Sequence, residues 1–296
     1  MAKSVRQFIS EQQPQYTMGV IMSKLNGLRS NLDTYIIVEG SDDKDFYEPF
    51  FKPDHCFIYW AQKESGDTGG CAYLQKVVSH IGALQRRTRI FGIMDTDYRR
   101  FRPGYKYPPH IFNTDHRDLE MTALSALPVQ EGLARWCPSL PQAFRTIMPV
   151  IRHIGYLRLM NDLHELGCNF DTIIKFTNVF EVSPRGVKYG WKDIIDKLFY
   201  SKKRRKKLRN SKRSYRMSSV AKANTYDLCQ GHDTIRMVAY ILNDNQYNQK
   251  QIWDKVKEKY TLEVFKSTQL YQKIRQWEEK HNAQIVKQST SIQGKE

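Results

Sequence analysis

The sequence predicts an α/β fold in which a parallel sheet flanked by helices is followed by a mostly helical C-terminal region. Two apolar runs, Tyr35–Val38 and Ile90–Met94, are typical of short strands that are buried on both faces of a sheet. Helical patterns separate the strand-like runs in the order β-α-β-α-β, loop, β-α. This alternation favours parallel strands that are joined by right-handed crossovers.

The elements before and after the first strand are predicted to be helical. Apolar residues spaced three and four positions apart indicate a leading amphipathic helix within residues 15–30. After the strand, Ser41–Asp43 supplies candidate N-cap residues, and aromatic residues between positions 46 and 50 fall on one face of the following helix.

The next elements continue the alternation of strands and helices. Cys56–Trp60 is predicted to be the second strand, and a helix with apolar residues at helical spacing is expected to run through about Leu84. The loop Ser65–Gly70 before that helix lacks the Gly-Lys-Ser/Thr ending of a P-loop, so we interpret it as a turn and helix start. The strand before Asp95 has a candidate neighbour at His110–Phe112, which leads into another helix.

Beyond about Leu127 the chain is expected to be mostly helical. We divide it into a sheet-forming core (1–127), a basic, mostly helical region that completes the fold and binds nucleic acid or a partner (128–285), and a polar tail expected to be disordered (286–296). The patterns of the second region are helical segments at Leu157–Leu166, Ile173–Phe176, Thr234–Leu242 and Tyr260–Trp277, a turn at Gly231–Asp233, and a turn or short strand at Val187–Trp191.

The net charge of +16 is unevenly distributed along the chain. Residues 1–120 hold 16 Lys/Arg and 15 Asp/Glu, whereas residues 121–296 hold 31 Lys/Arg and 16 Asp/Glu. Acidic strand ends combined with a strongly basic second part suit a polyanion such as nucleic acid. The alternative is a soluble basic protein without such a partner.

The composition also bears on the compartment. The five cysteines include no C-x-x-C pair, which argues against a disulfide framework or a zinc finger and fits a reducing cytosol. The first ten residues contain no apolar signal segment, and no apolar run of 18 residues occurs. We therefore expect a cytoplasmic protein that is neither secreted nor embedded in a membrane.

Acidic residues follow both of the predicted buried strands. Glu39 follows the first strand, and Asp95 and Asp97 follow the later one. Ligands of open α/β sheets bind at the carboxyl ends of the strands, so two neighbouring parallel strands would bring these three carboxylates together. Carboxylates at such distances repel each other, and the usual compensation is a hard cation such as Mg²⁺, which keeps water positions open for a phosphate.

A fourth acid, Asp43, lies four residues after Glu39 and can face the same site from one helical turn away. Taken separately, Glu39-Gly40 and Asp95-x-Asp97 are weak signals that occur in phosphatases, glycosyltransferases and unrelated turns. A haloacid-dehalogenase phosphatase is disfavoured, because its motif normally lies on the first strand and continues as Asp-x-Asp-x-Thr, whereas here Asp97 is followed by Tyr98-Arg99.

The two motifs together resemble the Toprim domain of topoisomerases, primases and overcoming-lysogenization-defect (OLD) nucleases. The acid at Asp43 is similar to that of the nuclease branch. A narrower resemblance, to the Toprim effectors that include AriB of the PARIS anti-phage system, covers most of the chain. It rests on four blocks in the same order, which are Val38–Tyr47, Gly92–Asp97, Asn113–Glu120 and Gly231–Asp233.

This resemblance implies a toxic effector with a Toprim-like catalytic core at residues 1–127. The effector would be a Mg²⁺- or Mn²⁺-dependent endonuclease that cleaves RNA, with tRNA as the class of target, once a partner ATPase of the ABC type releases it. Glu39, Asp43, Asp95 and Asp97 would hold the metal. Effectors of this kind often form homodimers.

Three further polar residues have two interpretations each. Asp118 and Glu120 either contact the metal or cap the helix that follows them. His232 either contacts a phosphate or protonates a leaving oxygen, or it is a turn residue. Many OLD-type nucleases use a late lysine, and His232 is the nearest candidate in this sequence; Lys44 is the alternative.

Two basic stretches are candidate nucleic-acid contacts. Tyr98–Tyr107 alternates cations with aromatic residues, which suits phosphate contact and base stacking but is also found in plain surface loops. Lys202–Arg216 would be an RNA-binding arm, a contact to an acidic partner, or a disordered run. The candidate residues are Arg99, Arg100, Arg102, Lys106, Lys203, Arg204 and Arg205.

Three other functions remain open on the sequence. The chain could be a regulatory subunit whose Toprim site is silent and which docks an ATPase. It could also be an OLD-like nuclease that acts on DNA. A primase or topoisomerase is disfavoured by the modest length and by the absence of a zinc-ribbon cysteine pattern.

Overall fold

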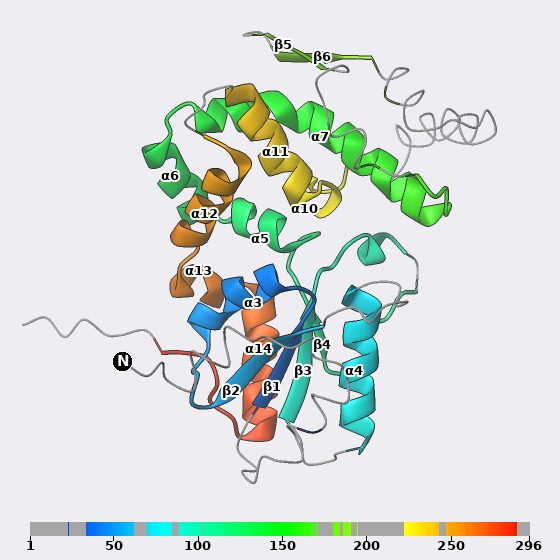
Figure 1. The fold of residues 1–296 in the computed structure, drawn as a ribbon, viewed down its shortest axis with the longest axis vertical. Coiled ribbons are helices and arrows are strands. Elements are labelled where there is room, and N and C mark those ends of the chain that lie inside the picture. The colour runs from blue at the N-terminus through cyan, green and yellow to red at the C-terminus, as the bar shows by residue number, and fades with distance from the viewer. Residues whose placement is uncertain are drawn as a thin grey trace, which may run out of the picture. The chain divides into compact units, whose positions relative to one another are not determined.

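The computed structural model describes the predicted sheet and most of the helices (Figure 1). The residues it describes are 23, 34–61, 70–84, 89–102, 104–168, 170, 180–183, 186–190, 194, 222–242 and 247–288. The helix predicted within residues 15–30 lies outside this part except for Ser23. The predictions for Ile173–Phe176 and Lys202–Arg216 lie outside it entirely.

The chain divides into two compact units, and each unit is built from separated segments. Unit 1 comprises Met1–Asp95, Lys106–Asn113 and Phe265–Glu296, and unit 2 comprises Thr96–Tyr105 and Thr114–Val264. The division therefore falls inside the Asp-x-Asp motif.

Unit 1 contains a four-stranded parallel sheet with the strand order β2-β1-β3-β4 (Figure 1). Its strands are β1 (Thr34–Val38), β2 (Cys56–Trp60), β3 (Arg89–Met94) and β4 (Ile111–Asn113). The predicted α/β fold with a parallel sheet is confirmed. Strand β4 lies one residue later than expected.

Helices cover both faces of this sheet. On one face, α4 (Gly70–Leu84) packs into a buried cluster with Ile90 and Met94 of β3. On the other face, Phe91 of β3 contacts Trp277 of α14 (Gln269–His281), with ring centroids 4.8 Å apart. Because successive strand residues point to opposite faces, burial on both sides accounts for the continuous apolar run.

Phe265, on α13 (Leu262–Lys266), packs against the aromatic residues at the end of α3 (Ser41–Tyr47) and in η1 (Glu48–Phe50). Its ring stacks on Phe50 at 5.0 Å between centroids and meets Tyr47 edge-on at 6.2 Å. The C-terminal segment thus completes the core that the N-terminal strands begin.

The C-terminal segment also reaches the sheet unit through backbone pairing. Val286 is buried and forms an antiparallel bridge with Phe51. The prediction of a tail from residue 286 is therefore wrong for its first residues. Residues 289–296 lie outside the described part.

The described part of unit 2 is mostly helical, as predicted for the region beyond Leu127. A hairpin of β5 (Phe180–Ser183) and β6 (Gly186–Tyr189) pairs in antiparallel fashion, and β6 falls where a turn or short strand was expected. The helices are η2 (Arg99–Phe101), α5 (Leu119–Ser125), α6 (Leu127–Trp136), α7 (Leu140–Leu163), α10 (Thr225–Leu228), α11 (Gly231–Leu242) and α12 (Gln249–Lys259).

Two helix boundaries differ from the prediction. Gly231–Asp233 forms the first turn of α11 rather than a turn before it. The single helix expected over Tyr260–Trp277 is two helices, because the Thr268 hydroxyl accepts a hydrogen bond from the backbone N–H of Tyr271 at 3.0 Å and begins α14 anew.

Candidate functional site

In unit 1, Glu39 and Asp95 follow two neighbouring parallel strands. The pairing of Ile37 with Gly92 places the carboxyl ends of β1 and β3 side by side. There, the backbone N–H of Asp95 donates a hydrogen bond to Oε1 of Glu39 at 2.9 Å. The predicted proximity of these two residues, 56 positions apart in the chain, is therefore present in the structure.

Asp43 is held close to the same strand end. Its Oδ2 atom accepts a hydrogen bond from the backbone N–H of Gly40 at 2.8 Å, directly after Glu39 in the chain. The N-cap of α3 is Gly40 rather than a residue of Ser41–Asp43, and Asp43 caps the helix by reaching back to it. This contact fixes the Asp43 side chain whether or not it also binds a ligand.

The N-terminus of α4 approaches the same place. A Cβ atom on Gly70 would lie 3.1 Å from the carbonyl oxygen of Glu39, which is tighter than an ordinary contact. A glycine at this position lets the helix pack directly on the backbone at the end of β1.

The carboxylates of unit 1 fit the chemistry of Mg²⁺ in type but do not form a complete cage. Among the described residues, no group of three or more His, Cys, Asp and Glu side chains is close enough to hold a metal ion. Mg²⁺ is commonly bound by only one or two carboxylates together with substrate phosphates and waters. Two carboxylates, those of Glu39 and Asp95, could therefore serve as the protein ligands of such an ion.

Asp97 belongs to unit 2, where its backbone is constrained. It has a positive φ of 47°, its N–H donates to the carbonyl oxygen of Arg117 at 2.7 Å, and its Oδ2 accepts from Arg99 at 2.9 Å. Asp97 keeps 42% of its side chain exposed, so the carboxylate stays accessible to solvent.

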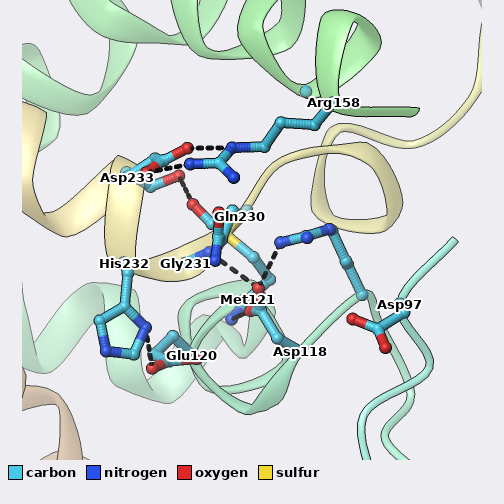
Figure 2. Close-up of polar contacts among 12 residues, drawn as sticks. Asp97, Asp118, Glu120, Met121, Arg158, Gln230, Gly231, His232 and Asp233 are labelled. Atoms are coloured by element: carbon cyan, nitrogen blue, oxygen red, sulfur yellow. Dashed lines mark hydrogen bonds and ion pairs between the residues drawn. The ribbon is translucent and has the colours of Figure 1, made fainter. Parts of the chain in front are cut away.

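Unit 2 contains a second polar cluster, with Asp118 at its centre (Figure 2). Asp118 is the N-cap of α5, and its Oδ1 accepts from the N–H of Met121 at 2.9 Å. Its Oδ2 accepts from the N–H of Gly231 at 2.9 Å and from Arg117 at 3.0 Å. The capping interpretation of Asp118 is thus correct, and the same carboxylate joins α5 to the start of α11.

Glu120 and His232, two separately predicted residues, lie in contact (Figure 2). Oε1 of Glu120 is 2.8 Å from Nδ1 of His232. Glu120 is buried, whereas 56% of the His232 side chain is exposed. A buried carboxylate therefore orients an imidazole whose other nitrogen is directed away from the pair.

The pair shifts the charge states of both residues. The hydrogen bond to Glu120 raises the pKa of His232 to about 9, against the effect of burial. Burial alone would raise the pKa of Glu120, but the hydrogen bond from His232 outweighs it and lowers that pKa below its ordinary value. Burial and the nearby Glu120 carboxylate raise the pKa of Asp118 to about 7. His232 is therefore an imidazolium at neutral pH and is suited to be a phosphate contact or a proton donor rather than a base.

The His232–Glu120 pair predicts a pH-dependent contribution to stability. For His232, whose folded pKa is raised, this contribution is complete below pH 6.5 and lost as the pH rises through about 9. For Glu120, whose folded pKa is lowered, it is present above pH 4.5 and lost on further acidification. Because solvent screens the partly exposed pair, its contribution to the free energy of unfolding is limited to about 1 kcal/mol.

The measurement is the free energy of unfolding of the wild type and of His232→Gln from pH 5 to about pH 10, with denaturant titrations. The difference between the two proteins is expected to be largest between pH 4.5 and 6.5 and to vanish above about pH 9. His80→Gln, at an exposed position of α4, is the matched control. A difference that grows with rising pH would contradict the pairing.

The cluster includes three residues that were not predicted as site residues. They are Arg117, which pairs with Asp118, and the pair Arg158 and Asp233, which Figure 2 labels. Arg158, from α7, donates from Nε and Nη2 to the two carboxylate oxygens of the buried Asp233 at 2.7 and 3.1 Å. Arg117 and Asp233 lie inside sequence blocks on which the family resemblance rests. That resemblance was the signal by which the sequence could have identified them as site residues. Arg158 lies in an ordinary amphipathic helix, where sequence alone gives no sign of a buried partner.

The arginines predicted to contact nucleic acid are engaged in ion pairs. Arg100 lies 2.5 Å from Oδ1 of Asp227, and Arg102 lies 2.8 Å from Oδ2 of Asp162. Tyr98, in the same stretch, is buried, and its hydroxyl donates to the carbonyl oxygen of Gly155 at 3.1 Å. Tyr98 therefore anchors the stretch instead of offering a ring for base stacking.

Apart from Arg99, the remaining basic residues predicted to contact nucleic acid are exposed or lie outside the described residues. Lys106 is exposed and belongs to unit 1. Lys203, Arg204 and Arg205 lie outside the described residues. Lys44, the alternative to a late lysine, pairs with Glu48 at 3.4 Å.

In comparisons with known proteins, no family model matches the chain, and no curated protein matches it. A search of the described helices finds none with the length and apolarity that a membrane span requires.

Proposed function

We propose that this protein is a metal-dependent nuclease with a Toprim-like core. The observation that carries the proposal is the contact between Asp95 and Glu39, which joins the ends of two parallel strands. Acidic residues at this edge of a sheet are where a cation-dependent phosphate site is expected. Hydrolysis of a phosphodiester is the reaction that such a site serves best.

Glu39 and Asp95 would hold the cation, with Asp43 beside them and Asp97 two residues further along the chain. A bound Mg²⁺ or Mn²⁺ supplies polarisation of the scissile phosphate and a water of lowered pKa. The Asp95 N–H fixes one oxygen of Glu39, so the side chain is oriented before any ligand arrives. His232, kept protonated by Glu120, can neutralise a phosphate or donate a proton to a leaving oxygen.

RNA is the proposed substrate, and tRNA its proposed class. The excess of basic residues after position 120 favours a polyanion, and the resemblance to AriB-type effectors favours tRNA over DNA. The same resemblance suggests a toxic anti-phage effector that an ABC-type ATPase restrains, acting as a homodimer in the cytoplasm.

Removal of metal tests the proposal. Purified protein is incubated with tRNA, other RNA and duplex DNA, in Mg²⁺ and in EDTA. We expect cleavage of tRNA in Mg²⁺ and its loss in EDTA, with recovery when Mg²⁺ or Mn²⁺ is restored, because the carboxylates require the cation to engage a phosphate. Cleavage that persists in EDTA would contradict the proposal, and preferential cleavage of DNA would replace its substrate.

A second candidate is a silent Toprim subunit that docks an ATPase. The observation that favours it is that no group of three metal-binding side chains occurs among the residues described. This candidate predicts no cleavage of any nucleic acid in Mg²⁺, together with stable binding to an ABC-type ATPase. The metal assay therefore separates the two candidates.

A further inference from the structure

Unit 2 contains a cavity of about 720 Å³ that adjoins Asp97 but is otherwise lined by residues outside the acidic strand ends and the His232–Glu120 pair. Cavities of this size are typical of small-molecule sites. Four arginines and two aspartates line it, so its lining carries a net positive charge. Its cationic and aromatic lining includes Arg99, Arg102, Arg117, Arg158, Tyr105 and Phe170.

Arg117 is the first sign that the cavity takes an anion. It is 93% buried, and Asp118 pairs with only one of its terminal nitrogens. Its Nε has no hydrogen-bond partner among the described residues. A buried donor without an acceptor is costly, and an anionic group in the cavity would relieve that cost.

Two guanidinium groups of the cavity lie over aromatic rings in the absence of any ligand. Arg117 lies over the ring of Tyr98 at 4.5 Å, and Arg158 lies over the ring of Phe170 at 4.6 Å. Asp233 holds Arg158 through two hydrogen bonds and leaves part of its five-donor fork unused. Arginines fixed in this way lose little entropy on binding a planar or tetrahedral anion.

The remaining lining is more accessible and mixes charge with aromatic surface. Arg102 pairs with Asp162, and their side chains are 46% and 40% exposed. Tyr105 is exposed as well. An exposed ion pair contributes little to stability, so Arg102 can exchange its carboxylate for a phosphate at small cost. Tyr105 supplies an aromatic ring of the kind on which a nucleobase stacks.

We propose that this cavity binds a nucleoside monophosphate unit, with its phosphate on Arg117, Arg158 and Arg102 and its base on the aromatic lining. The unit comes either from a nucleic-acid strand or from a free mononucleotide. The proposal deepens the proposed function, since a nuclease substrate contains such units. The test measures binding rather than cleavage, because arginines can bind a phosphate without a metal ion.

The test is calorimetric titration of the full-length protein in EDTA with 5′-AMP, inorganic phosphate and adenosine. We expect saturable binding of 5′-AMP, about tenfold weaker binding of phosphate, and no saturation by adenosine, since stacking adds to a charge-driven contact. A short single-stranded oligonucleotide distinguishes the two sources: tighter binding than 5′-AMP indicates a strand, and weaker binding indicates a free mononucleotide.

Two variants and a control locate the site. Arg158→Lys keeps the charge beside Asp233 but loses the fork, and Arg102→Glu reverses an exposed charge; each is expected to weaken 5′-AMP binding by about tenfold or more. Arg145→Glu, an exposed arginine of the same helix α7 that hydrogen-bonds to Gln142, is the control and should bind as the wild type does. Melting temperatures confirm that each variant is folded.

The proposal is overturned if 5′-AMP fails to saturate the protein at about 10 mM, where even a millimolar site would fill. It is also overturned if the two cavity variants bind as tightly as Arg145→Glu. Binding that survives together with an absence of cleavage in Mg²⁺ would reject the proposed nuclease activity and leave the nucleotide site in place.

Discussion

Glu39→Gln is expected to lower the proposed Mg²⁺-dependent cleavage by more than about 100-fold, because removing even a residue that only supports a metal ligand typically costs about 10- to 100-fold. The amide keeps an oxygen that can accept the hydrogen bond from the Asp95 N–H, so the geometry at the end of β1 is retained. What the substitution removes is the negative charge that attracts the cation. The measurement is the rate of tRNA cleavage at saturating Mg²⁺.

Glu48→Gln is the matched control for this experiment. Glu48 also lies in unit 1, but its side chain is 58% exposed and pairs with Lys44 at 3.4 Å. The Glu48→Gln variant should cleave tRNA as the wild type does and melt at the same temperature. If Glu39→Gln cleaves as fast as Glu48→Gln, the proposed role of the strand-end carboxylates is wrong.

Gly231→Ala is expected to destabilise the protein by about 2–4 kcal/mol through overpacking and loss of a buried hydrogen bond. A Cβ atom at this position would lie 2.2 Å from the Cβ of Glu120 and 2.8 Å from Oδ1 of Asp118. Neither neighbour can move without separating α5 from α11. The Gly231 N–H would then lose its hydrogen bond to Oδ2 of Asp118, the same oxygen that pairs with Arg117.

Urea unfolding of Gly231→Ala measures this loss, and Gly82→Ala is its control. A Cβ atom on Gly82 would meet no atom within 4 Å, and the residue lies inside α4. Alanine should stabilise this helix by about 0.5–1 kcal/mol. Equal midpoints for the two variants would mean that α5 and α11 do not pack as closely as described.

The strands could be predicted because their signal is local. Strands β1 and β3 are buried on both faces, so their apolar runs are continuous, and the helical pattern between them favours a parallel sheet. Parallel order then places Glu39 and Asp95 at the same edge. The sequence therefore predicts both the fold class and the contact between Glu39 and Asp95.

The rest depends on partners that are distant in the chain. Arg100 and Arg102 were predicted to contact nucleic acid, yet each pairs with a carboxylate, on α10 and on α7 respectively. Asp233 was assigned to a turn, and only the packing of α11 on α7 shows that it is a buried partner of Arg158. Local patterns report which face of a helix is apolar, but they do not report which opposite charge will lie against it.

The return of the C-terminal segment to the first strands has a consequence for biosynthesis. The residues that carry Glu39 and Asp95 leave the ribosome long before Phe265 and Trp277, which pack on Phe50 and Phe91. A nascent chain that ends short of these residues lacks both contacts and exposes the aromatic surface that they cover. Unit 1 thus reaches its full core only after Phe265 and Trp277 have been synthesised, and a chain terminated before them would present its acidic strand ends on an incomplete core.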